Sequence, residues 1–113
     1  MAADTVFGKI VAGGIPVEKL LETERLIAFA DIAPQAPVHL LVIPKTTEYA
    51  NVTALAAGDP GLLAEMVEAA KQLANEHADG DFRLIFNNGA NAGQTVFHVH
   101  AHVLAGGLEE GSL

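Results

Sequence analysis

The sequence of 113 residues contains no cysteine and no tryptophan, and it holds only six lysines and arginines against 14 acidic residues. Without cysteine there is no disulfide, no thiol nucleophile and no thiolate metal site. The formal net charge of −8 opposes binding to a nucleic-acid polymer or to an anionic membrane surface, since both require clustered cations. A single nucleotide is still compatible with this charge, because backbone N–H groups can bind its phosphate.

Long uninterrupted hydrophobic runs are also missing. The stretch from Leu26 to Pro44 is nearly uncharged, but Pro34 and Pro37 break any spanning helix within it. Residues 1–4 lack the basic and apolar regions of a signal peptide. These features, together with the absence of cysteine, predict a cytoplasmic protein. Half of the residues are apolar and the mean hydropathy is +0.32, so we expect one folded domain spanning residues 1–113.

The chain predicts an α+β fold with a mostly antiparallel sheet of about five strands. Asp4 and Thr5 predict the cap of a short helix that ends near Gly13. Asp59-Pro60 predicts the start of one long helix, because apolar residues then recur at helical spacing up to the stop at Gly80. Strands are expected at residues 17–21, 26–31, 38–43, 82–86 and 96–104, with a turn at 22–24 and a polar loop at 87–95.

Three of the five histidines alternate with apolar residues near the end of the chain: His98, His100 and His102. In a strand these side chains share one face, and Phe97, Val99, Ala101 and Val103 would pack on the core from the other. An exposed polar strand face would explain one histidine better than three. A functional site is therefore the favoured interpretation.

A metal site is one interpretation of this pattern, with His39 on another strand as a further ligand. However, the outer two histidines of the triplet lie about 13 Å apart along a strand, so all three cannot bind one zinc ion. We expect no required metal, and we predict adventitious zinc at His39, His98 and His100 at most.

Phosphoryl chemistry is the interpretation that we favour. A neutral imidazole is a competent nucleophile near pH 7. Attack on phosphorus also needs hydrogen-bond donors for the phosphate oxygens and a proton for the leaving group. A central histidine with neighbours on both sides, following Gly93-Gln94-Thr95, supplies these groups.

The segment from His98 to Leu104 fits the His-φ-His-φ-His-φ-φ signature of the histidine triad (HIT) superfamily, where φ is an apolar residue. Further matching segments follow one another in the same order along the chain: Asp4–Ile10, Phe29–His39, Val42–Lys45 and Gly93–Phe97. The sequence most resembles the histidine triad nucleotide-binding branch, the purine nucleoside phosphoramidases. The resemblance covers nearly the whole chain and implies a homodimer in which two sheets join edge to edge.

The resemblance also implies the reaction and its residues. The reaction is hydrolysis of a nucleoside 5′-phosphoramidate without an essential metal or other cofactor. His100 would be the nucleophile, forming a nucleotidyl-imidazole intermediate, with its other ring nitrogen held by a backbone carbonyl. His98 and His39 would orient it and relay protons. The α-phosphate would contact His102 and Thr95, with Asn87, Gly93 and Gln94 completing its cradle. Asp31 would bind the ribose hydroxyls, and the purine would be enclosed by Val6, Phe7, Ile10, Phe29 and Ile32.

Simpler roles are open for several of these residues. Asp31 precedes a proline corner and is equally suited to a turn. Phe7 and Phe29 fit ordinary core positions, and Asn87 fits an ordinary turn. His77 ends the long helix, where a cation complements the helix dipole, and is assigned no role in the site.

Two features depart from the family pattern. Thr95 stands where many relatives carry serine, which preserves the hydroxyl. Only a short acidic segment follows Gly107, whereas close relatives have a longer tail that helps to select the leaving group. We therefore predict a phosphoramidase. Hydrolysis of dinucleoside polyphosphates, a nucleotide-binding regulatory module and a metal-binding protein are the alternatives.

Overall fold

The computed structural model describes residues 4–111. Residues 1–3, which entered the signal-peptide prediction, and the last two residues of the acidic tail lie outside them. The fold is α+β, as predicted. In chain order the elements are α1 (Val6–Val11), β1 (Leu21–Glu22), β2 (Leu26–Ala30), β3 (Val38–Pro44), α2 (Val52–Gly58), α3 (Pro60–His77), β4 (Arg83–Ile85), the 3-10 helix η2 (Ala90–Ala92) and β5 (Ala101–Ala105).

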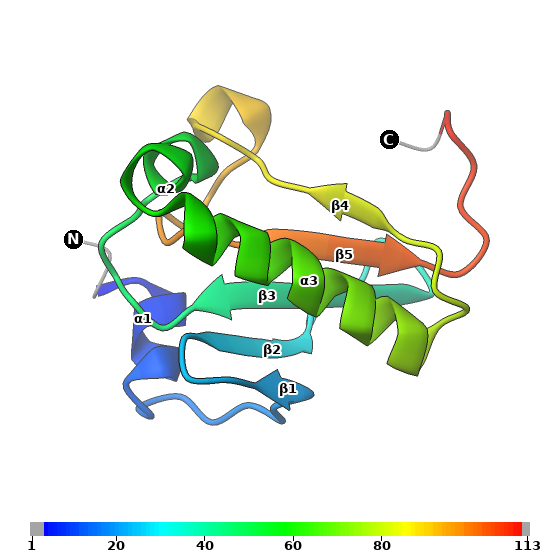
Figure 1. Ribbon diagram of the computed structural model, residues 1–113, viewed down its shortest axis with the longest axis horizontal. Coiled ribbons are helices and arrows are strands. Elements are labelled where there is room, and N and C mark those ends of the chain that lie inside the picture. Colours follow the sequence, from blue (N-terminus) through cyan, green and yellow to red (C-terminus); the bar gives the residue numbers. More distant parts are fainter. Residues whose placement is uncertain (1–3, 112–113) are drawn as a thin grey trace.

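The five strands form one antiparallel sheet in the order β1-β2-β3-β5-β4. β3 and β5 are therefore central neighbours although about 60 residues separate them, and α3 runs across one face of the sheet (Figure 1). The central pairing brings His39 opposite Leu104 and His102 opposite Leu41. Residues from two distant parts of the chain are thus placed on one surface.

Both faces of the sheet are covered, because alternate residues of the central strands enter different cores. One core packs against α2 and α3 and includes Leu40, Val42 and Leu73. The other packs against α1 and includes Phe7, Leu41 and Ile43. This explains why β3 is almost continuously apolar: a strand buried on both faces needs no polar alternation.

The predicted capped helices are confirmed. The Thr5 hydroxyl accepts from the Gly8 N–H at the start of α1, and the Asp59 carboxylate accepts from the Leu62 N–H at the start of α3. After α3, the N–H of Gly80 donates to the Ala74 carbonyl while Gly80 adopts a φ of +97°. Glycine tolerates that conformation far better than other residues, which is why the helix ends there.

Two of the predicted strands, the first and the last, begin several residues later than expected. The first strand is Leu21–Glu22 rather than residues 17–21, because Glu22 pairs with Ile27 and the turn starts one residue later. The last strand begins at Ala101 rather than residue 96. Accordingly, Phe97 is 45% exposed instead of lying in the core.

The sequence interpretation also missed α2. This helix lacks a long apolar repeat, and only its cap could have revealed it: the Asn51 side chain accepts from the Ala54 N–H.

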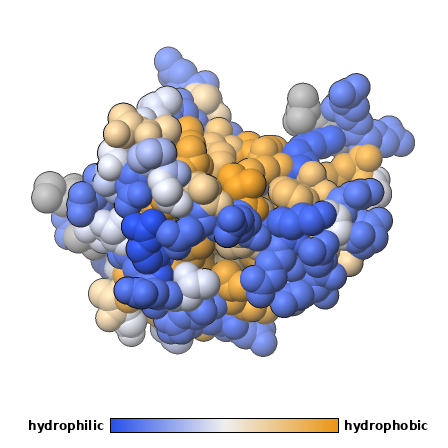
Figure 2. Space-filling view, viewed as in Figure 1, coloured by the Kyte–Doolittle hydropathy of each residue, from blue (hydrophilic) through white to orange (hydrophobic). Residues whose placement is uncertain are grey.

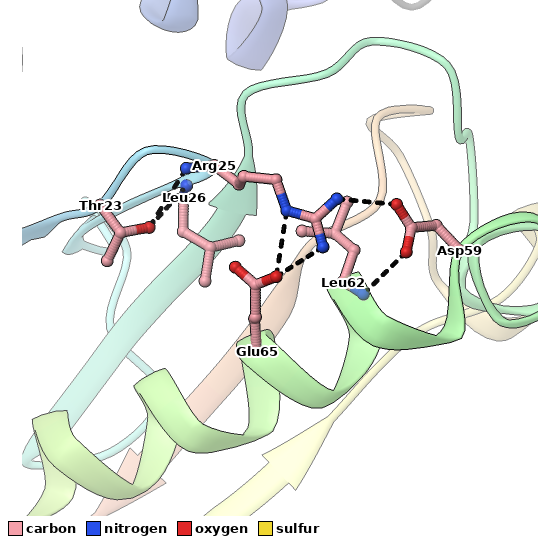
Figure 3. Close-up of polar contacts among 6 residues, drawn as sticks. All are labelled: Thr23, Arg25, Leu26, Asp59, Leu62 and Glu65. Atoms are coloured by element: carbon pink, nitrogen blue, oxygen red, sulfur yellow. Dashed lines mark hydrogen bonds and ion pairs between the residues drawn. The ribbon is translucent and has the colours of Figure 1, made fainter.

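A partly exposed ion network joins the turn between β1 and β2 to α3 (Figure 3). Arg25 donates through Nη1 to Asp59 at 2.8 Å and through Nε to Glu65 at 3.0 Å. The hydrogen bond from Arg25, followed by that from the Leu62 N–H, lowers the pKa of Asp59. Lys45 is likewise paired with Glu22 at 2.9 Å. These cations are engaged in ion pairs that hold the fold together.

None of the helices within residues 4–111 combines the length and the apolar composition that a membrane crossing requires.

Candidate active site

The three histidines of the triad lie on the face of the sheet that carries α1. Phe7 from α1 packs edge-on against His100, with ring centroids 4.8 Å apart, and against His98 at 6.3 Å. Val99, Ala101 and Val103 enter the opposite core. The predicted alternation is therefore correct, although only His102 lies within the regular strand. His98 is completely buried, so the histidine face is not a solvent-exposed polar surface.

His100 is held in one defined tautomer by the backbone. Its Nδ1 lies 2.8 Å from the carbonyl oxygen of His98. A carbonyl can only accept, so Nδ1 carries the proton and the lone pair of the neutral ring is on Nε2. The His98 ring is itself anchored, because its Nε2–H donates to the Pro44 carbonyl at 2.7 Å. His98 thus holds His100 through its backbone, while its ring fastens the segment to the end of β3.

His39 contacts His102 rather than His100. Its Nε2 lies 2.9 Å from Nδ1 of His102, and its Nδ1 accepts from the Gln35 N–H at 2.9 Å. Among the described residues, Nε2 of His102 is buried without a hydrogen-bond partner. The resemblance implied that His39 sits behind the nucleophile; the β3–β5 pairing places its ring against the third histidine of the triad.

Burial keeps all three triad histidines in the neutral form. Desolvation lowers the pKa of His98 and of His100, in both cases against the opposing effect of the carbonyl that each ring contacts. For His102, desolvation and the nearby His100 and His39 rings lower the pKa to about 4. A neutral imidazole at pH 7 is what a nitrogen nucleophile requires.

A cavity of about 640 Å³ opens beside α1, and Phe7, which packs against His98 and His100, is part of its wall. Most of its lining is apolar, and it includes all the residues predicted to enclose a purine: Val6, Phe7, Ile10, Phe29 and Ile32. Phe7 and Phe29 also pack edge-on against each other at 5.9 Å and belong to the core beneath. Ile32 lies at the rim with its side chain fully exposed. Such an exposed isoleucine could cover an apolar ligand.

Asp31 takes the turn role that the sequence left open, and it also lies at the cavity. Its Oδ1 accepts from the Ala33 N–H at 2.8 Å, as in an Asx turn, while its Oδ2 lies 3.4 Å from Nε2 of His39. Asp31 also lines the cavity. One carboxylate oxygen thus shapes the loop and the other faces the histidines.

Thr95 also lines the cavity and is exposed. It follows Gly93, which has a φ of +94° that residues with a side chain rarely adopt. A Cβ added at Gly93 would come within 3.9 Å of the Asn87 amide nitrogen, so these two predicted cradle residues are neighbours. Thr95, at the end of the loop of residues 87–95, is thus the member of this loop that lines the cavity.

Gln94 has a different role from the predicted one. Its side-chain amide donates to the carbonyls of Ala50 and Val96, its side-chain oxygen accepts from the Gly89 N–H, and its own N–H donates to the Gly89 carbonyl. All its donors are used within the protein, so it braces the loop instead of offering donors to a phosphate. Sequence reasoning missed the supporting segment, in which Ala50 and Thr53 contact this loop.

The structure does not cluster the ligand atoms of His39, His98 and His100, which were predicted as an adventitious zinc site. Within residues 4–111, the ligand atoms that cluster are those of Asp31, His39 and His102, all within 4.8 Å of one another. The Gln35 N–H occupies the lone pair on Nδ1 of His39, so Nε2, which faces the cluster, carries the proton. A cation would have to displace that proton, so the hydrogen bonds of this cluster do not suit a resident metal.

Sequence reasoning also missed the second wall of the cavity. Residues between α1 and β1 contribute Ile15, Pro16, Val17, Glu18 and Leu20. The segment contains no regular element, and only its apolar residues between Gly14 and Lys19 could have indicated it.

Comparison with known proteins places the chain in a family. Residues 4–112 match the family model described as "Scavenger mRNA decapping enzyme C-term binding". An uncharacterized HIT-like protein of Synechocystis is 46% identical over 107 residues, which cover 94% of this chain and 93% of that protein. The chain therefore belongs to the histidine triad superfamily.

Solved structures agree with this assignment. A HIT family hydrolase from Legionella pneumophila superposes with a TM-score of 0.86 and is 39% identical, covering 93% of this chain and 95% of the other. The histidine triad nucleotide-binding protein of Candida albicans superposes with a TM-score of 0.78 at 32% identity, covering 88% of this chain and 73% of the other. These two neighbours are thus named as a hydrolase and as a nucleotide-binding protein of the same superfamily.

Proposed function

We propose that the protein hydrolyses purine nucleoside 5′-phosphoramidates through a covalent intermediate on His100. The observation that carries this proposal is the hydrogen bond from Nδ1 of His100 to the His98 carbonyl at 2.8 Å. It leaves the lone pair of a neutral imidazole on Nε2, and burial keeps the ring unprotonated near pH 7.

The reaction would proceed in two displacements at phosphorus. Nε2 of His100 bonds to the phosphorus, the P–N bond breaks, and the amine leaves after gaining a proton from solvent, to which the attacking water of the second displacement returns one. Water then attacks the nucleotidyl-histidine, the bond to Nε2 breaks, and the nucleoside monophosphate is released. His102 and Thr95 would donate to the phosphate oxygens, where charge develops in each transition state. Asn87 and Gly93 would shape the loop around the phosphate.

The nucleoside would occupy the cavity beside α1. A volume of about 640 Å³ and a largely apolar lining suit a purine, and Asp31 at the same cavity offers a carboxylate to the ribose hydroxyls. With Oδ1 used by the Ala33 N–H, Oδ2 is the atom that would accept from the ribose.

The charge of the site favours an amine over a polyphosphate as the leaving group. None of the described residues that line the cavity is a lysine or an arginine, and two of them, Glu18 and Asp31, are acidic. A dinucleoside polyphosphate brings several negative charges, which usually require cations to stabilise them. A phosphoramidate with an amine leaving group carries fewer.

The test compares a fluorogenic adenosine phosphoramidate with diadenosine polyphosphate, each with and without EDTA. We expect kcat/KM for the phosphoramidate to exceed that for the polyphosphate by at least about tenfold, unchanged by EDTA, because a charge mismatch of this kind costs a kcal/mol or more. Preference for the polyphosphate would favour the neighbouring hydrolase branch. AMP binding without turnover of either substrate would identify a nucleotide-binding module, and loss of activity with EDTA would contradict the metal-free mechanism.

We further propose that two copies join through β4 into one larger sheet. β4 lies at a sheet edge, and the apolar side chains around it are only partly buried: Leu63, Phe82, Leu84 and Phe86. Val67 on α3 is 42% exposed. Figure 2 shows hydrophobic surface gathered between α3 and β4. An edge strand beside an apolar surface is suited to strand pairing with a second copy.

Sedimentation velocity at micromolar concentration should therefore detect a dimer. Val67→Glu should shift the population towards monomer by placing a charge in the apolar contact, whereas Gln72→Glu, which adds the same charge on an exposed position of α3, should not. A wild-type monomer at this concentration, or equal behaviour of the two variants, would contradict the proposed interface.

A further inference from the structure

The hydrogen bonds around His39 determine which nitrogen of His102 carries a proton. The backbone N–H of Gln35 can only donate, and it points at Nδ1 of His39 at 2.9 Å. Nδ1 of His39 must therefore be the acceptor, so the proton of the neutral ring is on Nε2. Nε2 of His39 lies 2.9 Å from Nδ1 of His102, so it donates this proton and Nδ1 of His102 accepts it. The single proton of neutral His102 is then on Nε2.

The series of hydrogen bonds ends at Nε2 of His102, on a ring that lies beside the His100 ring. Nε2 of His102 is buried and, among the described residues, has no partner. A buried N–H without a partner is costly. Because two preceding hydrogen bonds fix the proton on this nitrogen, the N–H calls for an acceptor on a ligand. The His100 ring lies beside it, with ring centroids 5.1 Å apart. An acceptor bound there would lie next to the atoms bonded to His100.

We propose that His39 is a positioning residue that holds His102 in its Nε2–H tautomer, so that His102 presents a hydrogen-bond donor to a phosphate oxygen. In this series of hydrogen bonds, the Gln35 N–H donates to His39, His39 donates to His102, and His102 donates to the phosphate oxygen. His39 acts on the third histidine of the triad and not on the nucleophile. The part of this inference that names a phosphate oxygen rests on the proposed function.

The tautomers can be measured directly, without substrate. In two-bond ¹H–¹⁵N correlation spectra of ¹⁵N-labelled protein at pH 7, we expect His102 to show a protonated Nε2 and an unprotonated Nδ1. His39→Leu removes the donor and should give His102 a mixture of both tautomers. His39→Gln, whose amide N–H replaces the donor near the position of Nε2, should restore the wild-type pattern. His77→Gln, at the exposed end of α3, is the matched control and should leave it unchanged.

Activity provides the second readout. His39→Leu should lower kcat/KM for the phosphoramidate about 10–100-fold, the usual effect of losing a partner that orients a site residue, and His39→Gln should recover most of it. An Nδ1–H tautomer of His102 in the wild type, or an unchanged His102 tautomer in His39→Leu, would overturn the proposal. If His39→Leu fails to fold, the wild-type spectrum still decides. Because the spectra need no turnover, a failed phosphoramidase assay with the expected tautomers would refute the function and not the role of His39.

Discussion

His100→Ala should abolish turnover while leaving AMP binding nearly intact. Removing the attacking atom eliminates the covalent route, and we expect kcat to fall by roughly 10⁴-fold or more. The purine would be held by the apolar cavity and the ribose by Asp31, so the dissociation constant of AMP should change by no more than about threefold. Product-formation assays measure kcat, and calorimetric titration with AMP measures the dissociation constant.

His100→Asn is the sharper variant. Its amide N–H occupies the place of Nδ1 and can keep the hydrogen bond to the His98 carbonyl, but it has no atom equivalent to Nε2. It should therefore be as inactive as His100→Ala and fold as well as the wild type. His77→Ala serves as the histidine control with full activity. Substantial turnover by His100→Asn would rule out His100 as the nucleophile. A loss of AMP affinity as large as the loss of rate would show that His100 mainly contributes to AMP binding.

Acidification should destabilise the protein well before most carboxylates are protonated. Burial lowers the pKa of His98 and His100, and burial with the neighbouring His100 and His39 rings lowers that of His102 to about 4. Between this value and the unfolded pKa of about 6.5, the unfolded chain binds more protons than the folded one. The stabilisation is therefore complete above pH 6.5 and is lost as the pH falls towards 4.

For His102 alone this loss is on the order of 3 kcal/mol across that range, and the other two histidines act in the same direction. Urea denaturation at pH 7.5, 6, 5 and 4.5 should show a falling free energy of unfolding. His102→Gln should flatten that slope, whereas His77→Gln should not. A free energy of unfolding that stays constant from pH 7 to 5 would contradict the neutral, buried histidines.

The same pKa shift gives activity a different pH dependence from that of a free histidine. Since burial lowers the pKa of His100 below its ordinary value, a pH–rate profile should show the acid-side decline at a lower pH than a free histidine would give.

The sequence by itself determined the features that depend on local chemistry. Alternation of His98, His100 and His102 with apolar residues was readable because a strand-like backbone has a period of two. Capping residues and glycines located α1 and α3, since caps act within one turn of a helix. The lack of cysteine excluded thiolate sites, and apolar segments bounded by proline and glycine indicated the central strands.

The tertiary structure decided what depends on contacts between distant segments. Pairing of β3 with β5 placed His39 beside His102 instead of His100, and no local pattern encodes that register. Gln94 looked like part of a phosphate loop, but Ala50, 44 residues away in the chain, takes one of its donors. The tautomers of His100 and His102 likewise follow from a carbonyl and an amide N–H brought within hydrogen-bonding distance by the fold. Proton positions of this kind are fixed only when donors and acceptors meet in space, because the residues themselves permit either tautomer.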